Sequence, residues 1–175
     1  MVLRKRLKLT GQALVFVTTT VKDWVPLFSE SHYAREALMQ FGECLKSYRV
    51  ESVAYVLMPS HFHALLGFDQ VERLSRFMQT FKSLTSRRLR PIITASLLDQ
   101  FTNDSGRFGL WKPRFDDFIV TSEEQFRTKL NYIHTNPVRA ELVESPGDYQ
   151  YSSAADWLED NPGPIQIDKN CSWIT

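Results

Sequence analysis

The chain has 175 residues, of which 43% are hydrophobic and 23% charged, and its formal net charge is +1. These values are typical of one globular domain with a sizeable core, and taken as a whole they do not indicate a nucleic-acid binder. No apolar run reaches the roughly 18–20 residues of a membrane helix, and the basic amino terminus lacks the apolar stretch of a signal peptide. Because Cys44 and Cys171 lie far apart without metal-ligand spacing, we expect free thiols and a cytoplasmic location.

The first third of the chain predicts a strand followed by a helix. Residues 13–21 (ALVFVTTTV) are apolar and rich in β-branched side chains, which favours a strand. Ser29 stands where a serine can cap the start of a helix. Apolar side chains then recur at helical spacing, at Ala34, Leu38, Phe41, Leu45 and Tyr48.

A hairpin and a second helix are predicted next. Residues 52–58 (SVAYVLM) and 61–68 (HFHALLGF) have the composition of strands, and Pro59 and Ser60 between them favour a tight turn. The helix that follows is indicated by an apolar stripe at Val71, Leu74, Phe77, Met78, Phe81 and Leu84.

The segment after this helix is the hardest to assign. Pro91 predicts that the helix ends near it. Residues 91–110 show no clear periodicity, although residues 103–109 have the composition of a loop. A fourth strand is predicted at residues 114–120 (RFDDFIV).

A last helix is predicted from about residue 121. Ser122 and Gln125 have the spacing of a capping box, and Pro137 predicts an end near Asn136 because proline disfavours helical torsions in the residue before it. From Trp157 the chain becomes acidic and contains Pro and Gly, which indicates a tail.

The order of these elements, β-α-β-β-α-β-α, predicts an α+β fold. It is the split βαβ order of a ferredoxin-like antiparallel sheet with helices packed mainly on one face. We expect one domain over residues 1–155 and a C-terminal tail over residues 156–175.

Two histidines are candidate metal ligands. Alternate residues of a strand point to the same face, so His61 and His63 are expected to project together while Phe62 enters the core. Two neighbouring imidazoles can chelate one metal, but the spacing alone leaves open two exposed strand histidines. No dense cluster of carboxylates lies nearby in the sequence, so a third ligand must come from elsewhere.

The last helix offers both a nucleophile and a third ligand. Its apolar stripe, Phe126, Leu130 and Ile133, is expected to pack on the sheet. Lys129, Tyr132 and Asn136 lie on a neighbouring face at three- and four-residue spacing. From spacing alone, Tyr132 can equally be an aromatic at the margin of the core, and Asn136 can merely cap the helix end.

Other chemically capable residues rank lower. His134 points away from Tyr132 on a helix, and it and His32 are expected to be surface or structural histidines. Asp116 and Asp117 are candidate ligands behind Asn136, because strand residues of this kind usually face solvent.

Basic residues supply candidate contacts to a phosphate backbone. Trp111 and Arg114 are further candidates, for stacking on or hydrogen bonding to a base, although Trp111 also suits the core. The remaining candidate DNA contacts are Lys129, the helix residues Arg73, Arg76, Lys82, Arg87 and Arg88, and the amino-terminal Arg4 and Arg6.

Three segments together resemble one known family. YVLMPSHFHALLGF is similar to the His-hydrophobe-His strand of HUH-class transposases, and LWKPRFDDFIV to their Trp-x-x-x-Phe-x-Asp strand. LNYIHTNPVRAELVESPGDYQYSS resembles the signature YIHxNPVRAGLVxxPxDYxySS of REP-associated tyrosine transposases. Two positions depart from the family pattern: Glu141 stands where Gly is usual, and Ser60 where Asn, Asp or Glu is usual.

The resemblance implies an HUH nuclease fold and a site. It implies that Tyr132 is the nucleophile, that His61 and His63 bind a divalent metal, and that Asn136 completes the coordination. The implied substrate is single-stranded DNA, often a hairpin at a palindromic repeat, which is cut through a 5′-phosphotyrosine intermediate. The chain would act as a monomer or homodimer, and no association with a membrane is expected.

Two points of chemistry follow from the residues. A phenol is mostly protonated at neutral pH, so we expect Lys129, one turn before Tyr132, to stabilise the phenolate or to contact phosphate. Paired imidazoles by themselves suit zinc or manganese, whereas the resemblance favours Mg²⁺ or Mn²⁺.

Two other functions remain open at this point. A ferredoxin-like module that binds single-stranded DNA or RNA without cutting would be indifferent to Tyr132, although the aromatic-glycine signatures of an RNA-recognition motif are absent. A metal-dependent phosphodiesterase that uses water would cleave without forming a covalent adduct. Within the resembled family, the sequence does not separate an active transposase from a domesticated descendant.

Overall fold

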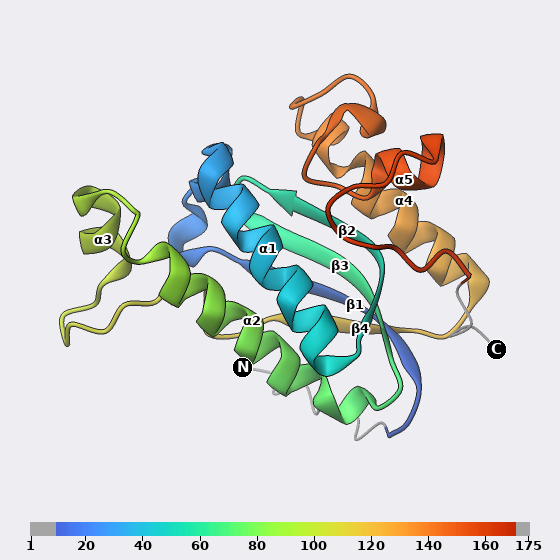
Figure 1. Ribbon diagram of the computed structural model, residues 1–175, viewed down its shortest axis with the longest axis horizontal. Coiled ribbons are helices and arrows are strands. Elements are labelled where there is room, and N and C mark those ends of the chain that lie inside the picture. Colours follow the sequence, from blue (N-terminus) through green and yellow to red (C-terminus); the bar gives the residue numbers. More distant parts are fainter. Residues whose placement is uncertain (1–9, 171–175) are drawn as a thin grey trace, which may run out of the picture.

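The computed structural model describes residues 10–170 and is built on one antiparallel sheet (Figure 1). Its four strands lie in the order β2-β3-β1-β4. They are β1 (Ala13–Thr20), β2 (Glu51–Met58), β3 (His61–Phe68) and β4 (Asp116–Val120). The predicted α+β order of elements is confirmed, and the hairpin of β2 and β3 turns at Pro59 and Ser60 as expected.

Helices α1 (Ser31–Tyr48) and α2 (Leu74–Leu89) cover one face of the sheet, in front of the strands in Figure 1. Every second strand residue, such as Val15 on β1 and Phe62 on β3, faces these helices in the main core. Phe41 of α1 lies at the centre of this core and contacts the ring of Phe62 at a centroid distance of 4.9 Å. Large apolar residues at helical spacing therefore fix the position of both helices.

Helix α4 (Glu123–Arg139) lies on the opposite face together with the short helix α5 (Ala154–Glu159). The predicted stripe packs as expected: Ile133 is fully buried, and Phe126 and Leu130 pack against strand residues such as Phe16 and Leu65. Helices were expected mainly on one face of the sheet; α1 and α2 share a face, whereas α4 and α5 lie on the other. Since α4 covers only part of the second face, side chains there remain accessible.

Some helix boundaries differ from those that the sequence predicts. Ser29 lies in a 3-10 turn, Leu27–Ser29, and α1 begins after Glu30, which makes no side-chain cap. Ser122 does cap α4 by accepting a hydrogen bond from the Gln125 amide at 3.2 Å. A short helix without a clear apolar period, α3 (Ala95–Phe101), was not predicted; the side chain of Thr94 caps it.

The expected end of the last helix at Asn136 is wrong, because α4 continues through Pro137 to Arg139. Proline removes one amide donor and disfavours helix in the residue before it. Here the Pro137 ring is buried, and hydrogen bonds beyond it, from the Ala140 amide to the Asn136 carbonyl and from the Leu142 amide to the Pro137 carbonyl, hold the last turn.

The expected tail is attached to the sheet over the part of it that the structure describes. Trp157 of α5 donates from Nε1 to the Val53 carbonyl at 2.8 Å, and the Asp168 amide donates to the Ser52 carbonyl at 2.8 Å. Ile165 is buried in the main core. A packed indole and a packed isoleucine outweigh the acidic, Pro/Gly-bearing composition that indicated a tail.

Three residues discussed from the sequence, Arg4, Arg6 and Cys171, lie outside the described residues. Cys44 is buried as a free thiol in α1, and burial raises the pKa of that thiol to about 11. None of the helices in residues 10–170 has the length and apolar character needed to cross a membrane.

Candidate active site

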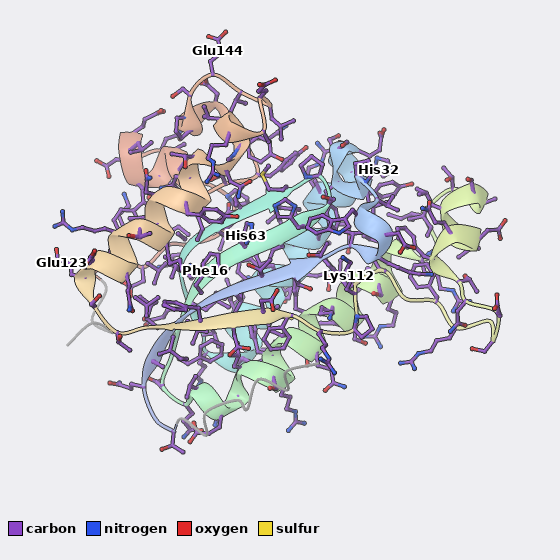
Figure 2. The ribbon with its side chains drawn as sticks, turned by 180° about the vertical axis from the view of Figure 1, so that it is seen from behind. Phe16, His32, His63, Lys112, Glu123 and Glu144 are labelled. Carbon is purple, nitrogen blue, oxygen red and sulfur yellow. The ribbon has the colours of Figure 1, made fainter. Side chains whose placement is uncertain are left out.

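A cleft of about 690 Å³ lies between the sheet and α4, on the face that α4 covers only in part. His61 and His63 line it from β3, and Tyr132 and Asn136 line it from α4. Figure 2 shows His63 and Phe16 on this face of the sheet, beside α4. The cleft therefore unites the four residues that the sequence singled out for chemistry.

The strand alternation places the two histidines as predicted. Their ring centroids are 4.8 Å apart, whereas Phe62 between them is 1% exposed in the main core. Burial lowers the pKa of His61, and burial with the nearby charges of His61 and Lys129 lowers the pKa of His63 to about 3. Both imidazoles are therefore neutral at physiological pH, which is the form that binds a metal.

The hydrogen bonds of His63 leave one nitrogen free. Its Nδ1 lies 2.7 Å from the Thr18 hydroxyl on the adjacent strand β1. Its Nε2 is buried and has no hydrogen-bond partner within residues 10–170. A buried polar nitrogen without a partner costs free energy unless something binds it. A Thr18 hydroxyl that accepts from Nδ1–H would leave the lone pair of Nε2 for a ligand.

The rest of a coordination sphere must come from uncharged groups of the chain or from the substrate. Across the described part of the chain, no three His, Cys, Asp or Glu side chains cluster as metal ligands do. Asn136 is the remaining candidate oxygen donor that lines the cleft. Two neutral imidazoles and an amide oxygen would leave a metal with open positions and an undiminished charge, which suits binding of phosphate oxygens.

Tyr132 is held by packing beside the histidines. Its ring centroid lies 5.2 Å from that of His63 and 6.0 Å from that of Phe16, edge to face in both cases. The ring is partly exposed, so the phenol of a side chain that lines the cleft is accessible to a substrate. The reading of Tyr132 as an aromatic at the core's margin is correct for its ring, and it does not exclude a chemical role for its hydroxyl.

Two cations flank Tyr132 along α4. Lys129 places its Nζ 4.6 Å from the Phe16 ring centroid and 4.8 Å from that of Phe118. Arg139 places its guanidinium 5.6 Å from the Tyr132 ring centroid. Cation–π contacts of this length hold both side chains at the cleft. A negative group that enters the cleft would meet a positive charge on each side of Tyr132.

The sequence did not identify five residues that line the cleft, of which Ala140 at the end of α4 is one. Phe16 and Thr18 face it from β1, and the period of two along residues 13–21 places them on one face without showing that they oppose β3. Arg139 reaches Tyr132 because α4 continues past Pro137, although proline disfavours helix in the residue before it. Trp24 lines the rim from a turn that carries no recognisable pattern.

Most other predicted DNA contacts lie elsewhere. Lys82 is bound to the chain itself, since its Nζ donates to the carbonyls of Lys112, Pro113 and Arg114. Trp111 is 6% exposed and packs against Phe28 and Phe81, so it belongs to the core and is not placed to stack on a base.

The remaining predicted basic residues lie away from Tyr132. Arg87 and Arg114 line a larger groove of about 2630 Å³ formed by α2, α3 and β4. Arg76 and Arg88 are exposed on α2, on the other side of the sheet, and Arg73 is exposed in the 3-10 turn Val71–Arg73 that precedes α2. The groove also contains further basic residues, namely Lys22, Arg90, Arg107 and Lys112, as well as Lys82.

The lower-ranked candidates have structural or peripheral places. His134 is buried, and its Nε2 lies 3.0 Å from the Ser153 hydroxyl, as expected of a structural histidine. His32 is exposed at the start of α1, far from His63 in Figure 2. Asp116 on β4 pairs with Thr18 of β1 and is exposed, whereas the next residue, Asp117, faces the other side of the sheet.

Comparison with known proteins points to one family. The family model described as "Transposase IS200 like" matches residues 13–136, which is more than half of the chain. A candidate REP-associated tyrosine transposase of Haemophilus influenzae is 24% identical over 152 residues, which cover 82% of this chain and 81% of that protein. The REP-associated tyrosine transposase of Escherichia coli K12 is 23% identical over 100 residues, 57% of this chain and 52% of that one.

Solved structures agree on the fold. The structure of a REP-associated tyrosine transposase bound to a REP hairpin superposes with a TM-score of 0.72 at 18% identity, covering 97% of this chain and 93% of that chain. A candidate transposase from Deinococcus radiodurans R1 gives a TM-score of 0.50 at 18% identity, over 75% of this chain and 95% of that one.

Proposed function

The chain belongs to the IS200-like transposase family, and from this premise we propose that it cleaves and rejoins single-stranded DNA with Tyr132 as the nucleophile. The observation that carries the proposal is the position of Tyr132, whose ring lies 5.2 Å from His63 in a cleft that His61 and Asn136 also line. A nucleophile beside two imidazoles that can hold a metal suits phosphoryl transfer through a covalent intermediate.

In the proposed reaction, the Tyr132 hydroxyl oxygen forms a bond to the phosphorus of the scissile phosphate and loses its proton. The bond from phosphorus to the 3′ oxygen breaks, and that oxygen takes up a proton to become a free 3′-hydroxyl. The product is a 5′-phosphotyrosyl link, which a second 3′-hydroxyl reverses to rejoin strands. The link conserves the energy of the phosphodiester, so the reaction consumes no nucleotide.

Lys129 and Arg139 support this reaction by charge. Each holds a cation near Tyr132, Lys129 over Phe16 and Arg139 over the Tyr132 ring. Positive charge that is already in place stabilises the developing charge on phosphate, without reorganisation during the reaction.

The residues present fit a divalent metal, for which we propose Mg²⁺ or Mn²⁺. The buried Nε2 of His63, which has no hydrogen-bond partner among residues 10–170, and the neutral imidazole of His61 are suitable nitrogen ligands, and the Asn136 amide oxygen is a suitable third. When bound, the metal would stabilise charge on the non-bridging phosphate oxygens. Thr18, through its hydrogen bond to His63 Nδ1, holds the ring in the orientation for binding.

We further propose that the substrate is a DNA hairpin formed by a palindromic repeat. The name of the relative from Haemophilus influenzae and the hairpin in the solved neighbour support this class of substrate. Exposed cations of the larger groove, such as Arg87 and Arg114, are candidate contacts to the hairpin backbone. The buried free thiol of Cys44 fits the reducing cytoplasm as the place of action.

The test combines purified protein with labelled hairpin oligonucleotides from the repeats that flank its gene, in Mg²⁺ or Mn²⁺. A denaturing gel is expected to show a covalent protein–DNA band that disappears with Tyr132→Phe and with a chelator. Tyr151→Phe is a suitable control, because Tyr151 is a buried tyrosine outside the cleft.

Two outcomes would replace this proposal. Cleavage that persists in the Tyr132→Phe variant without a covalent band would indicate a hydrolase that uses water. Hairpin binding that is followed by no cleavage in either metal would indicate a binding module or a domesticated descendant.

A further inference from the structure

The turn that follows β1 carries two residues in a backbone conformation that side chains rarely adopt. Asp23 and Trp24 have φ values of 56° and 58°, in the left-handed region. This conformation is strained for a residue other than glycine and persists only where the surrounding structure enforces it. Such residues cluster at sites that hold ligands.

The surroundings of this turn do enforce the conformation. The Val21 amide donates to the Ser60 carbonyl, and the Lys22 amide donates to the Leu110 carbonyl, each at 2.8 Å. The Lys112 amide donates to the Thr20 carbonyl at 2.8 Å, which fixes the segment of Lys112 beside the same turn. Trp24 and Lys112 are therefore presented from a backbone that is anchored on both sides.

The result of this conformation is an exposed indole at the rim of the candidate active site. Trp24 is 57% exposed, lines the cleft of Tyr132, and meets the ring of His61 edge to face at 5.8 Å. Lys112 places its Nζ 4.6 Å from the centroid of the same indole. Figure 2 shows Lys112 beyond the end of the sheet, on the side away from Glu123 at the start of α4.

We propose that Trp24 and Lys112 form a binding subsite for one nucleotide of single-stranded DNA beside the scissile phosphate, in which a base stacks on the indole and Lys112 contacts the neighbouring phosphate. This inference rests on the proposed function and adds a positioning element to it. Every base has a flat π face, so an exposed, rigid indole binds it with little dependence on sequence. A cation next to the ring supplies the charge that a phosphodiester requires.

The location favours DNA over another protein as the occupant. The indole borders the cleft that holds Tyr132, so a strand whose phosphate lies at Tyr132 passes the rim of that cleft. A nucleotide stacked there would hold the strand in one register and limit the phosphates that Tyr132 can reach. Trp24 thus acts on the reaction by positioning the strand, not by touching the reacting atoms.

The experiment measures binding apart from cleavage. The full chain carrying Tyr132→Phe is titrated into a fluorescently labelled oligothymidylate of twelve nucleotides, and the Kd is read by anisotropy. Adding Trp24→Ala is expected to weaken binding about tenfold, because stacking of one base on an aromatic ring contributes on this scale. Trp24→Phe retains a ring and is expected to recover most of the affinity, which a purely structural role of the indole would not explain.

A matched control and a second measurement sharpen the result. Met39→Ala removes a side chain of similar exposure, 54%, on α1 outside the cleft, and is expected to leave Kd unchanged. Lys112→Ala is expected to lower the slope of log Kd against log salt by about one, as the loss of one phosphate contact does.

The outcomes separate this inference from the proposed function. If Trp24→Ala leaves the Kd of the Tyr132→Phe parent unchanged, the subsite is wrong, whereas the proposed tyrosine mechanism is unaffected. A parent that binds neither oligothymidylate nor hairpin DNA would overturn both.

Discussion

On the face of the sheet covered by α1 and α2, Phe62 is buried among aromatic rings, whereas on the other face its sequence neighbours His61 and His63 border a cleft. Both faces come from the same strands, and the alternation of side chains divides them. Two long helices close the first face. On the second, α4 leaves room beside Tyr132. Residues one position apart on β3 therefore serve stability and chemistry separately.

Two buried histidines on the second face differ in how their polar atoms are satisfied. In the packed region under α5, the structural histidine His134 is paired with the Ser153 hydroxyl. In the cleft, the Nε2 of the equally buried His63 has no partner in the described structure. A fold that satisfies one buried imidazole and leaves the other open gives up stability at the second position. Buried polar atoms of Tyr55 and Trp111 also lack a partner among residues 10–170, so it is the position of His63 in the cleft of Tyr132 that indicates function.

The largest expected effect comes from His63→Leu. We expect covalent adduct formation to fall below detection, because a metal ligand is lost. The free energy of unfolding is expected to stay within about 1 kcal/mol of the parent or to rise, since an apolar side chain replaces a ring whose buried Nε2 has no partner among residues 10–170. Chemical denaturation in the presence of a chelator measures the second effect. A loss of several kcal/mol would show that His63 serves the core, and would remove the contrast between the faces.

The converse change lies in the core of the first face. Phe41 is fully buried and contacts the rings of Tyr55, Phe62, Phe77 and Phe81. Phe41→Ala is expected to lower the free energy of unfolding by about 3–5 kcal/mol, which is the usual cost of such a cavity. Below its melting temperature, the adduct formed per folded molecule should equal that of the parent. A specific loss of adduct in folded protein would show that the two faces are coupled.

A smaller effect is expected at Thr18, which supports His63 from β1. Thr18→Val removes the hydroxyl at 2.7 Å from His63 Nδ1 and preserves the shape of the side chain. We expect the Mn²⁺ concentration for half-maximal adduct formation to rise about 10–100-fold, as is typical when a group that orients a metal ligand is lost. Thr18→Ser, which retains the hydroxyl, is the control. Equal metal dependence in all three proteins would mean that Thr18 does not orient the ligand.

The strands, and which candidate site residues share a face, were largely predictable because both follow from local spacing. Residues 61–68 match β3 at both ends, and local alternation is sufficient to place His61 and His63 on one face. The four-residue spacing of Tyr132 and Asn136 on α4 is equally local. What brings the two pairs together is the packing of α4 on β2 and β3, which no local pattern specifies; the family resemblance supplied it.

The errors occurred where tertiary contacts override local preference. Pro137 predicts a helix end, but its buried ring and the hydrogen bonds beyond it extend α4. The composition after Trp157 predicts a tail, but the hydrogen bond from its indole to Val53 attaches α5 to β2. Trp24 was not found at all, because its exposure depends on a left-handed turn that has no glycine to mark it.

The smallest predicted effect concerns Glu141, where the resembled family usually has glycine. Glu141 has a φ of 56°, just past the end of α4, so a side chain stands in a conformation that glycine adopts without steric cost. Glu141→Gly is expected to raise the free energy of unfolding by about 0.5–1 kcal/mol, because the relieved strain exceeds the entropy that glycine adds to the unfolded chain. Thermal melting of the purified variant measures this.

Ala140→Gly, at a φ of −90°, is the control and should lower the melting temperature. If both variants are destabilised, the left-handed conformation at Glu141 carries no strain, and the family's glycine there must serve something other than the turn. If only Glu141→Gly is stabilised, the left-handed conformation is strained, and equal adduct formation by this variant would extend the separation of stability from chemistry to the helix that carries Tyr132.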